Sequence, residues 1–126
     1  MRSFICALVI TAVIISSCLL YVNKMDEISL EMITINERTY DFIAGENYTE
    51  AEKSTEELKQ YLEDNRVLLA ATGDHEEIKE LEIRCCELTE IIRCGIYCDA
   101  MAKCASIEML LRHLPSNYKM RAENIL

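Results

Sequence analysis

The chain has 126 residues, which is enough for one domain and a short anchor. Half of its residues are apolar, and many of these lie in the first 22 positions. In contrast, all 22 acidic residues and 12 of the 13 Lys and Arg residues follow Asn23. The resulting charge of −10 repels phosphate backbones, so we expect no nucleic-acid partner and a domain of about 100 residues with one modest core.

The first feature along the chain is an uncharged apolar run from Phe4 to Val22, preceded by Arg2. Its 19 residues would span about 28 Å as a helix, which is close to the hydrocarbon thickness of a bilayer. We therefore expect residues 1–23 to form a transmembrane anchor.

Two other interpretations of this run remain open. It could be a cleaved secretory signal, or a lipoprotein signal in which Cys18 is lipidated, since Ile15-Ser16-Ser17-Cys18 fits that pattern. However, the apolar run continues for four residues beyond Cys18, and no small-x-small cleavage site follows it. A retained anchor therefore explains the segment better.

The remaining sequence predicts helices that end near Gly45, Gly73, Gly95 and Pro115. Glycine tolerates the left-handed residue after a last turn, and proline cannot donate to a continuing helix. In the first stretch, six residues recur at alternating steps of three and four, which places them on one face. They are Met25, Ile28, Met32, Ile35, Thr39 and Phe42.

The second and third stretches show the same spacing. The second contains Ala51, Thr55, Leu58, Leu62, Asn65 and Leu69, flanked by Tyr61 and Leu68. Thr49 and Glu52 have the spacing of a capping box at its start. The third contains Ile78, Leu81, Cys85, Leu88 and Ile92. Asp74 is its expected N-cap, with Glu77 three residues later.

A new register replaces that of the third stretch after Ile92, since the old one would place Gly95 and Asp99 in the core. The new register comprises Ala100, Cys104, Ile107, Leu111 and Leu114. We expect a helix break between Arg93 and Asp99, with Asp99 as the next cap, because Gly95 weakens a helix. The alternative is one long helix with a stutter in its repeat.

These patterns predict an all-α protein in which an N-terminal transmembrane helix continues into an up-and-down antiparallel bundle of about four helices. No stretch shows the sustained alternation of a β-strand. We expect an anchor over residues 1–23, a helical bundle domain over 24–115 and a C-terminal tail over 116–126.

Four cysteines of the expected bundle are the candidates for a metal or redox site. They are Cys85, Cys86, Cys94 and Cys98. At about 100° per residue, one helix cannot gather all four thiols at a point, and no Cys-x2-Cys pair is present. We therefore expect structural thiols, with no metal and no cofactor. A helix break near Gly95 keeps thiol chemistry open, because it could fold Cys98 or Cys104 back toward Cys86.

No motif in the sequence indicates an enzyme, and we expect no catalytic residue. His75 lies in the acidic run Asp74-His75-Glu76-Glu77, but acids also suit the positive end of a helix dipole. His113 lies at the end of the last expected helix, where a cationic side chain meets unsatisfied carbonyls. P-loop, dinucleotide-binding, serine-elbow and His-Glu-x-x-His patterns are all missing.

The apolar start and three motifs resemble a family of short, uncharacterised bacterial proteins with one N-terminal span, classed as a domain of unknown function. The motifs are Asp74-His75-Glu76-Glu77-Ile78, Leu110-Leu111-Arg112-His113-Leu114 and Glu123-Asn124-Ile125-Leu126. The family carries an aromatic residue near each end of the second helix. Tyr48 fits the first position, but Asn65-Arg66-Val67 offers no aromatic at the second.

The resemblance implies a single-span protein of the cell membrane, with its helical domain outside the cytoplasm and no assigned activity. Basic residues on the two sides of the run nearly balance, so charge alone does not fix the orientation. We expect a structural or protein-interaction module whose partner is another protein. The alternative is a thiol-dependent metal-binding or redox protein that uses the four candidate cysteines.

Overall fold

The computed structural model describes residues 1–71 and 75–125, with side chains up to Leu114. Within these residues the chain is helical and contains no strand, which confirms the all-α prediction. The helices are α1 (Arg2–Ala44), α2 (Tyr48–Asp64), α3 (Arg66–Ala70), α4 (His75–Arg93) and α5 (Tyr97–Ile125).

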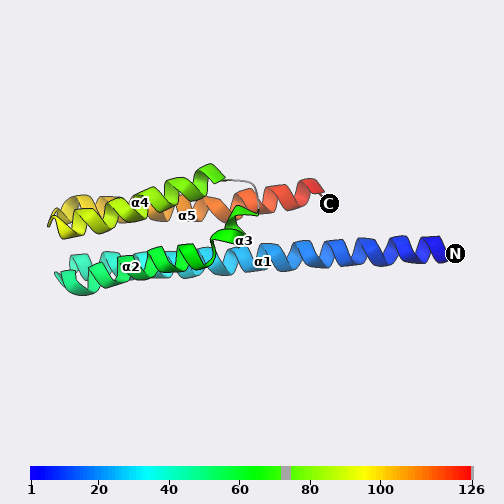
Figure 1. Ribbon diagram of the computed structural model, residues 1–126, viewed down its shortest axis with the longest axis horizontal. Helices are drawn as coiled ribbons and strands as arrows, with labels where there is room; N and C mark the ends of the chain where they lie inside the picture. Colours follow the sequence, from blue (N-terminus) through cyan, green and yellow to red (C-terminus); the bar gives the residue numbers. More distant parts are fainter. Residues whose placement is uncertain (72–74, 126) are drawn as a thin grey trace.

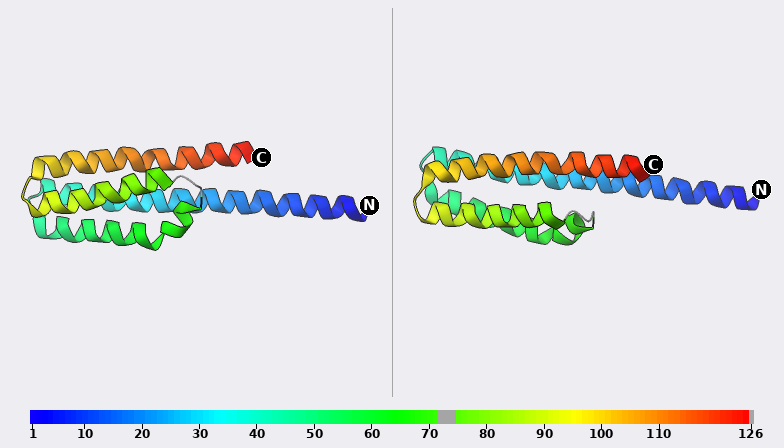
Figure 2. Two further views of the ribbon diagram at one scale, coloured as in Figure 1. Left: turned by 45° about the horizontal axis from the view of Figure 1, so that its top comes forward. Right: turned by 90° about the horizontal axis from the view of Figure 1, so that it is seen from above.

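Four of the helices form an up-and-down antiparallel bundle, as predicted (Figure 1). α1 packs against α2 and α5, and α4 packs against the same two helices, so α1 and α4 occupy opposite corners. The short α3 connects the end of α2 with α4. α1 extends far beyond the other helices, and α5 continues past the start of α4 in the same direction (Figure 2).

The heptad positions predicted for α4 and α5 line the core. Every one of them is buried: Ile78, Leu81, Cys85, Leu88, Ile92, Ala100, Cys104, Ile107, Leu111 and Leu114. In α1 the buried face is wider than the predicted stripe, because Ser29, Asn36 and Ile43 are buried beside it. These three residues follow one another at intervals of seven residues, so they lie along one line on the helix surface. α1 contacts both α2 and α5, and a helix that contacts two neighbours buries a broader face than one that contacts a single partner.

The predicted break near Gly95 is confirmed, and the stuttered single helix is excluded. α4 ends at Arg93 and α5 begins at Tyr97. Gly95 has a φ of +76°, in the left-handed region where a side chain would be strained. Its N–H donates to the Ile92 carbonyl at 3.0 Å, which closes the last turn of α4. The expected cap Asp99 lies instead inside the first turn of α5.

The predicted capping box at the start of α2 is wrong. α2 begins at Tyr48 with Asn47 as its N-cap and without a side-chain capping bond, so Thr49 lies within the first turn. Glu52 does not reach back to the backbone but accepts a hydrogen bond from Arg93 of α4. A strong charged donor from the neighbouring helix thus replaces the local contact. The other expected cap, Asp74, lies outside the described residues.

The second predicted stretch is divided at Asn65 into α2 and α3. The Asn65 side chain donates through Nδ2 to the Tyr61 carbonyl at 2.8 Å. Asparagine side chains compete with the backbone for such carbonyls, so they favour the ends of helices. The buried positions Leu62 and Leu69 nevertheless both remain in the core across the break.

The last helix does not end at Pro115 as expected. α5 continues to Ile125, so most of residues 116–126, assigned to a tail, are helical. Proline removes one N–H donor, which in a helix would bond the Leu111 carbonyl, but it leaves the later donors in place. One lost bond is therefore compatible with a helix that continues beyond it.

Candidate functional site

The most unusual surface of the molecule is the N-terminal half of α1, where large apolar side chains are exposed. They include Phe4, Ile5, Leu8, Val9, Ile10, Val13, Ile14, Leu19 and Leu20. The helix is long and apolar enough to span a membrane, and no residue of its most apolar stretch is buried against the bundle. Such an exposed apolar surface marks a contact with a membrane or another protein.

Two polar side chains within this apolar segment bond to their own helix. Thr11 Oγ1 donates to the Ala7 carbonyl at 2.8 Å, and Ser17 Oγ donates to the Val13 carbonyl at 2.8 Å. In hydrocarbon no water is present to satisfy a hydroxyl, so an internal acceptor is required. The segment therefore meets the hydrogen-bonding requirement of a lipid-embedded helix at both positions.

The change from exposed to buried side chains occurs near Tyr21. Leu20 is 70% exposed, whereas Met25 is fully buried in the core. Between them, the Tyr21 hydroxyl donates to the Leu68 carbonyl of α3 at 3.2 Å. Tyrosine commonly lies at the membrane–water interface, where its ring is apolar and its hydroxyl is polar. Tyr21 thus joins the apolar half of α1 to the bundle.

The four candidate cysteines do not converge on a metal site. Cys85 is buried, whereas Cys86, Cys94 and Cys98 are exposed. In the part of the chain that the structure describes, no group of three or more His, Cys, Asp and Glu side chains could hold a metal ion. The metal-binding alternative is therefore not favoured. The expectation of packed structural thiols fits Cys85 but not the three exposed residues.

Two buried thiols lie side by side in the core instead. Burial raises the pKa of Cys85 to about 12, and the neighbouring Cys86 and Cys104 add to the shift. Burial likewise raises the pKa of Cys104 to about 12. A thiol that stays protonated at neutral pH is a poor nucleophile and a poor metal ligand. Both residues therefore act as small apolar core side chains.

The two histidines singled out from the sequence both lie at exposed helical positions. His75 is the exposed first residue of α4, and Glu76 and Glu77 follow it in the first turn. This is the arrangement expected at the positive end of a helix dipole. His113 is exposed near the end of the described side chains of α5.

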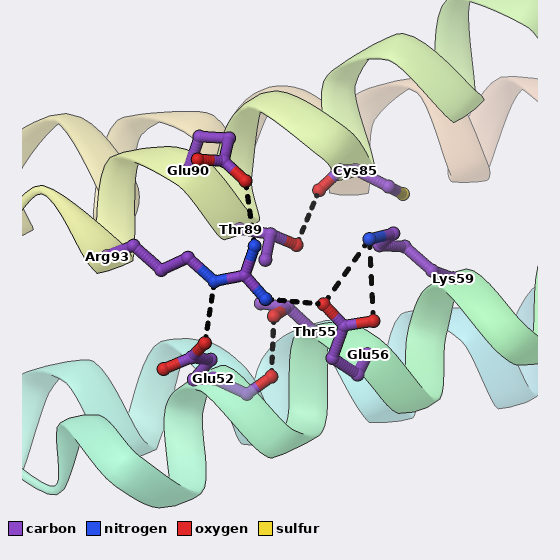
Figure 3. A network of polar contacts seen from close by, with 8 residues as sticks. All are labelled: Glu52, Thr55, Glu56, Lys59, Cys85, Thr89, Glu90 and Arg93. Carbon is purple, nitrogen blue, oxygen red and sulfur yellow. Dashed lines mark hydrogen bonds and ion pairs between the residues drawn. The ribbon is translucent and has the colours of Figure 1, made fainter.

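An ion-pair network on the bundle surface joins α2 to α4 (Figure 3). The Arg93 guanidinium donates to Glu52 at 2.7 Å and Glu90 at 2.8 Å, and it contacts Glu56 at 3.3 Å. Its hydrogen bonds raise the pKa of Arg93, and the bond with Glu52 has the larger effect and the bond with Glu90 the next. The network is solvent-exposed, so it positions one helix against the other and adds little to stability. We assign it a structural role.

A polar groove between α1 and α5 was not identified from the sequence. Asn36 and Cys104 lie in it, together with Glu37 and Tyr40 of α1 and Glu108 of α5. The available signal was the polar residue Asn36 in the widened face of α1, seven residues after Ser29 and seven before Ile43. The predicted stripe was too narrow to include it.

The fold and its exposed segment define a class of protein, namely a four-helix bundle whose first helix is extended by an apolar, membrane-span-length segment. The chain belongs to DUF4363, a domain of unknown function, whose family model matches residues 19–125. This confirms membership of an uncharacterised family, as the sequence resemblance implied. No curated protein and no solved structure matches the chain significantly.

Proposed function

We propose that the protein is a membrane-anchored module that presents its helical bundle to another protein. One observation carries the anchoring: the apolar half of α1 projects from the bundle, with none of its most apolar stretch buried. Burial of this surface in a bilayer would remove roughly 25 cal/mol per Å² of unfavourable apolar hydration. Residues 1–23 form the anchor in this proposal, and the specific biological role of the module stays open.

The anchor is tested in the full chain by replacing both Val9 and Val13 with Lys. These side chains are 53% and 59% exposed, so the change leaves the core intact. Each Lys at the centre of a span costs about 2.5–3.5 kcal/mol of insertion free energy. We expect the wild type to resist carbonate extraction from membranes and the double variant to be released. Leu30→Lys, on the same helix at a position 63% exposed, is the matched control.

Two results would contradict a retained anchor. Release of the Leu30→Lys control together with the double variant would mean that added charge alone detaches the protein. A mature chain that begins at a lipid-modified Cys18, shown by intact mass, would replace the span by a lipid. In either case the bundle itself would be unaffected, because its core begins at Met25.

For the orientation, we propose that the bundle lies outside the cytoplasm, at the surface of a bacterial cell membrane. This rests on the resemblance of the sequence motifs, since Arg2 and Lys24 flank the apolar run with similar charge. The exposed thiols of Cys86, Cys94 and Cys98 provide a test. A membrane-impermeant maleimide should label them in intact cells. Labelling that occurs only after lysis would place the bundle in the cytoplasm.

Exposed apolar side chains on the bundle support a protein partner. Val67 is 87% and Met109 is 65% exposed. A photo-crosslinking residue at Met109 should yield a discrete adduct in membranes, whereas one at the exposed polar position Lys79 should not. Identical adducts from both positions would indicate random collision and would count against a specific partner.

A further inference from the structure

The groove between α1 and α5 has a volume of about 410 Å³, which suits a small ligand or a single long side chain. Its walls come from two helices that are distant in the sequence but pack together along the bundle. Asn36 of α1 and Cys104 of α5 are both buried, so they form its floor.

Asn36 is the unusual residue of this floor, because it is a polar side chain that is only 1% exposed. Its Nδ2 donates to the Cys104 carbonyl at 2.8 Å, which fixes the orientation of the amide. Its Oδ1 accepts no hydrogen bond from any residue that the structure describes. A buried acceptor without a donor is costly, so this oxygen favours a ligand that brings an N–H or O–H group.

The charge of the groove selects among such donors. Glu37 and Asp41 contribute carboxylates from adjacent turns of α1, and Glu108 contributes one from α5. At the rim, the Arg112 guanidinium bonds Glu108 at 2.6 Å and lies 3.8 Å from Glu37. One positive charge against three negative charges leaves the groove with a formal charge of −2. This charge repels an anionic donor and favours a cationic donor over a neutral one.

The remaining wall is aromatic. The Tyr40 side chain lines the groove and is 39% exposed. Aromatic faces attract organic cations, whereas Mg²⁺ demands octahedral oxygen ligands and retains its water. No described cluster of three or more metal-ligating side chains is present here or elsewhere. The combination of an amide acceptor, carboxylates and a phenol ring therefore matches an organic cation better than a metal ion.

We propose that this groove binds an organic cation through an ammonium or guanidinium group. The cationic N–H donates to Asn36 Oδ1, Asp41 and the other carboxylates balance its charge, and Tyr40 contacts its methylene groups. The same chemistry occurs in a free diamine and in a lysine or arginine side chain of a protein segment. Binding would occur on the bundle and does not depend on the membrane anchor.

Isothermal titration calorimetry on the full chain in a neutral detergent at low salt tests the proposal. The probes are 1,5-diaminopentane, butylguanidinium and a blocked lysine peptide, with Mg²⁺ for comparison. We expect one saturable site for the organic cations with a dissociation constant of about 1 mM or lower, and no saturable heat from Mg²⁺. Tighter binding of the peptide identifies a protein side chain as the occupant, and tighter binding of the diamine identifies a free amine.

Two variants separate the site from general acidity. Asp41→Asn should weaken binding by about three- to tenfold, since it removes one carboxylate of the partly exposed groove. Glu31→Gln makes the same charge change on α1 but should leave binding unchanged. Glu31 faces α2, where burial and then the carboxylates of Glu31 and Glu27 raise the pKa of Tyr61.

A third variant tests the floor. Asn36→Leu should abolish binding, and a thermal melt followed by circular dichroism shows whether that variant remains folded. If this variant does not fold, the comparison of Asp41→Asn with Glu31→Gln still shows whether the groove is the binding site. Equal binding by these two variants, saturable Mg²⁺ binding at the same site, or no saturable binding of any organic probe would overturn the proposal.

Discussion

Leu88 of α4 offers the clearest test of the packing, because its side chain is fully buried at the centre of the bundle. Leu88→Ala removes three carbon atoms, and at about 0.8 kcal/mol for each buried methylene the transfer term alone is roughly 2.4 kcal/mol. The cavity that remains adds to this, so we expect a total loss of about 2–5 kcal/mol. That is a large share of the 5–15 kcal/mol typical of a small domain.

The same substitution at Leu30 provides a matched control, since that side chain is 63% exposed on the bundle portion of α1. We expect Leu30→Ala to change stability by less than about 0.5 kcal/mol. Thermal unfolding of the full chain in detergent, followed by helical circular dichroism, measures both. A loss of 3 kcal/mol should lower the Tm by roughly 12–24 °C in a domain of this size.

The reasoning would be refuted if the two leucine variants melted within a few degrees of each other. Such a result would mean that α4 does not present Leu88 to a packed core, and that its register is rotated. A large effect at Leu30 with a small one at Leu88 would identify the exposed face of α1 as an oligomer interface. Repeating the melt at several protein concentrations separates these two explanations.

Three further predictions follow from individual contacts. Thr39→Val should lower the free energy of unfolding, measured with a chemical denaturant, by about 1–2 kcal/mol. The buried Thr39 hydroxyl lies 2.6 Å from Ser54 Oγ, and a valine would leave Ser54 with only its longer bond of 3.3 Å to the Ile35 carbonyl. Arg93→Ala should lower the Tm at low salt and have less effect at high salt, because screening already weakens the exposed network. A thiol reagent should modify the exposed bundle cysteines in the native state, but Cys85 and Cys104 only after unfolding.

The same two thiols should make stability depend on pH. Their folded pKa of about 12 lies above the ordinary value of 9.0, so the folded state favours the protonated thiol. The contribution of the two protonated thiols to the free energy of unfolding is complete below pH 9. It is lost as the pH rises toward 12, because the thiols then ionise in the unfolded state but not in the folded state. Replacing both residues with Ala should reduce the loss of stability across that window, as measured by urea unfolding at several pH values.

Much of the fold could be predicted because the heptad repeat changes its register at the place where one helix ends and the next begins. The register from Ile78 to Ile92 cannot continue through Gly95, and the structure breaks the helix there. The division at Asn65 could not be foreseen in the same way. A single asparagine competes only weakly for a helical carbonyl, and tertiary packing decides whether the helix continues.

The candidate sites were harder to predict than the fold. Spacing along one helix shows which cysteines share a face, but only the packing of α4 against α5 brings Cys104 next to Cys85. The groove containing Asn36 depends on α1 contacting two neighbours, which no single heptad reveals. The buried polar residue was visible in the sequence, but the helix that completes its surroundings lies 68 residues away.

The uninterrupted course of α1 has a mechanical consequence. No glycine or proline occurs between Arg2 and Ala44, so the helix has no hinge between its apolar and its packed half. From Asn23 to Ala44 the helix rises about 32 Å. Tyr48 and Tyr97, whose rings stack on each other, are the first residues of α2 and α5, at the end of the bundle opposite the apolar segment. If the apolar segment spanned a bilayer at right angles, these rings would lie at about that height above it. A tilt of the apolar half would therefore move the far end of the bundle sideways.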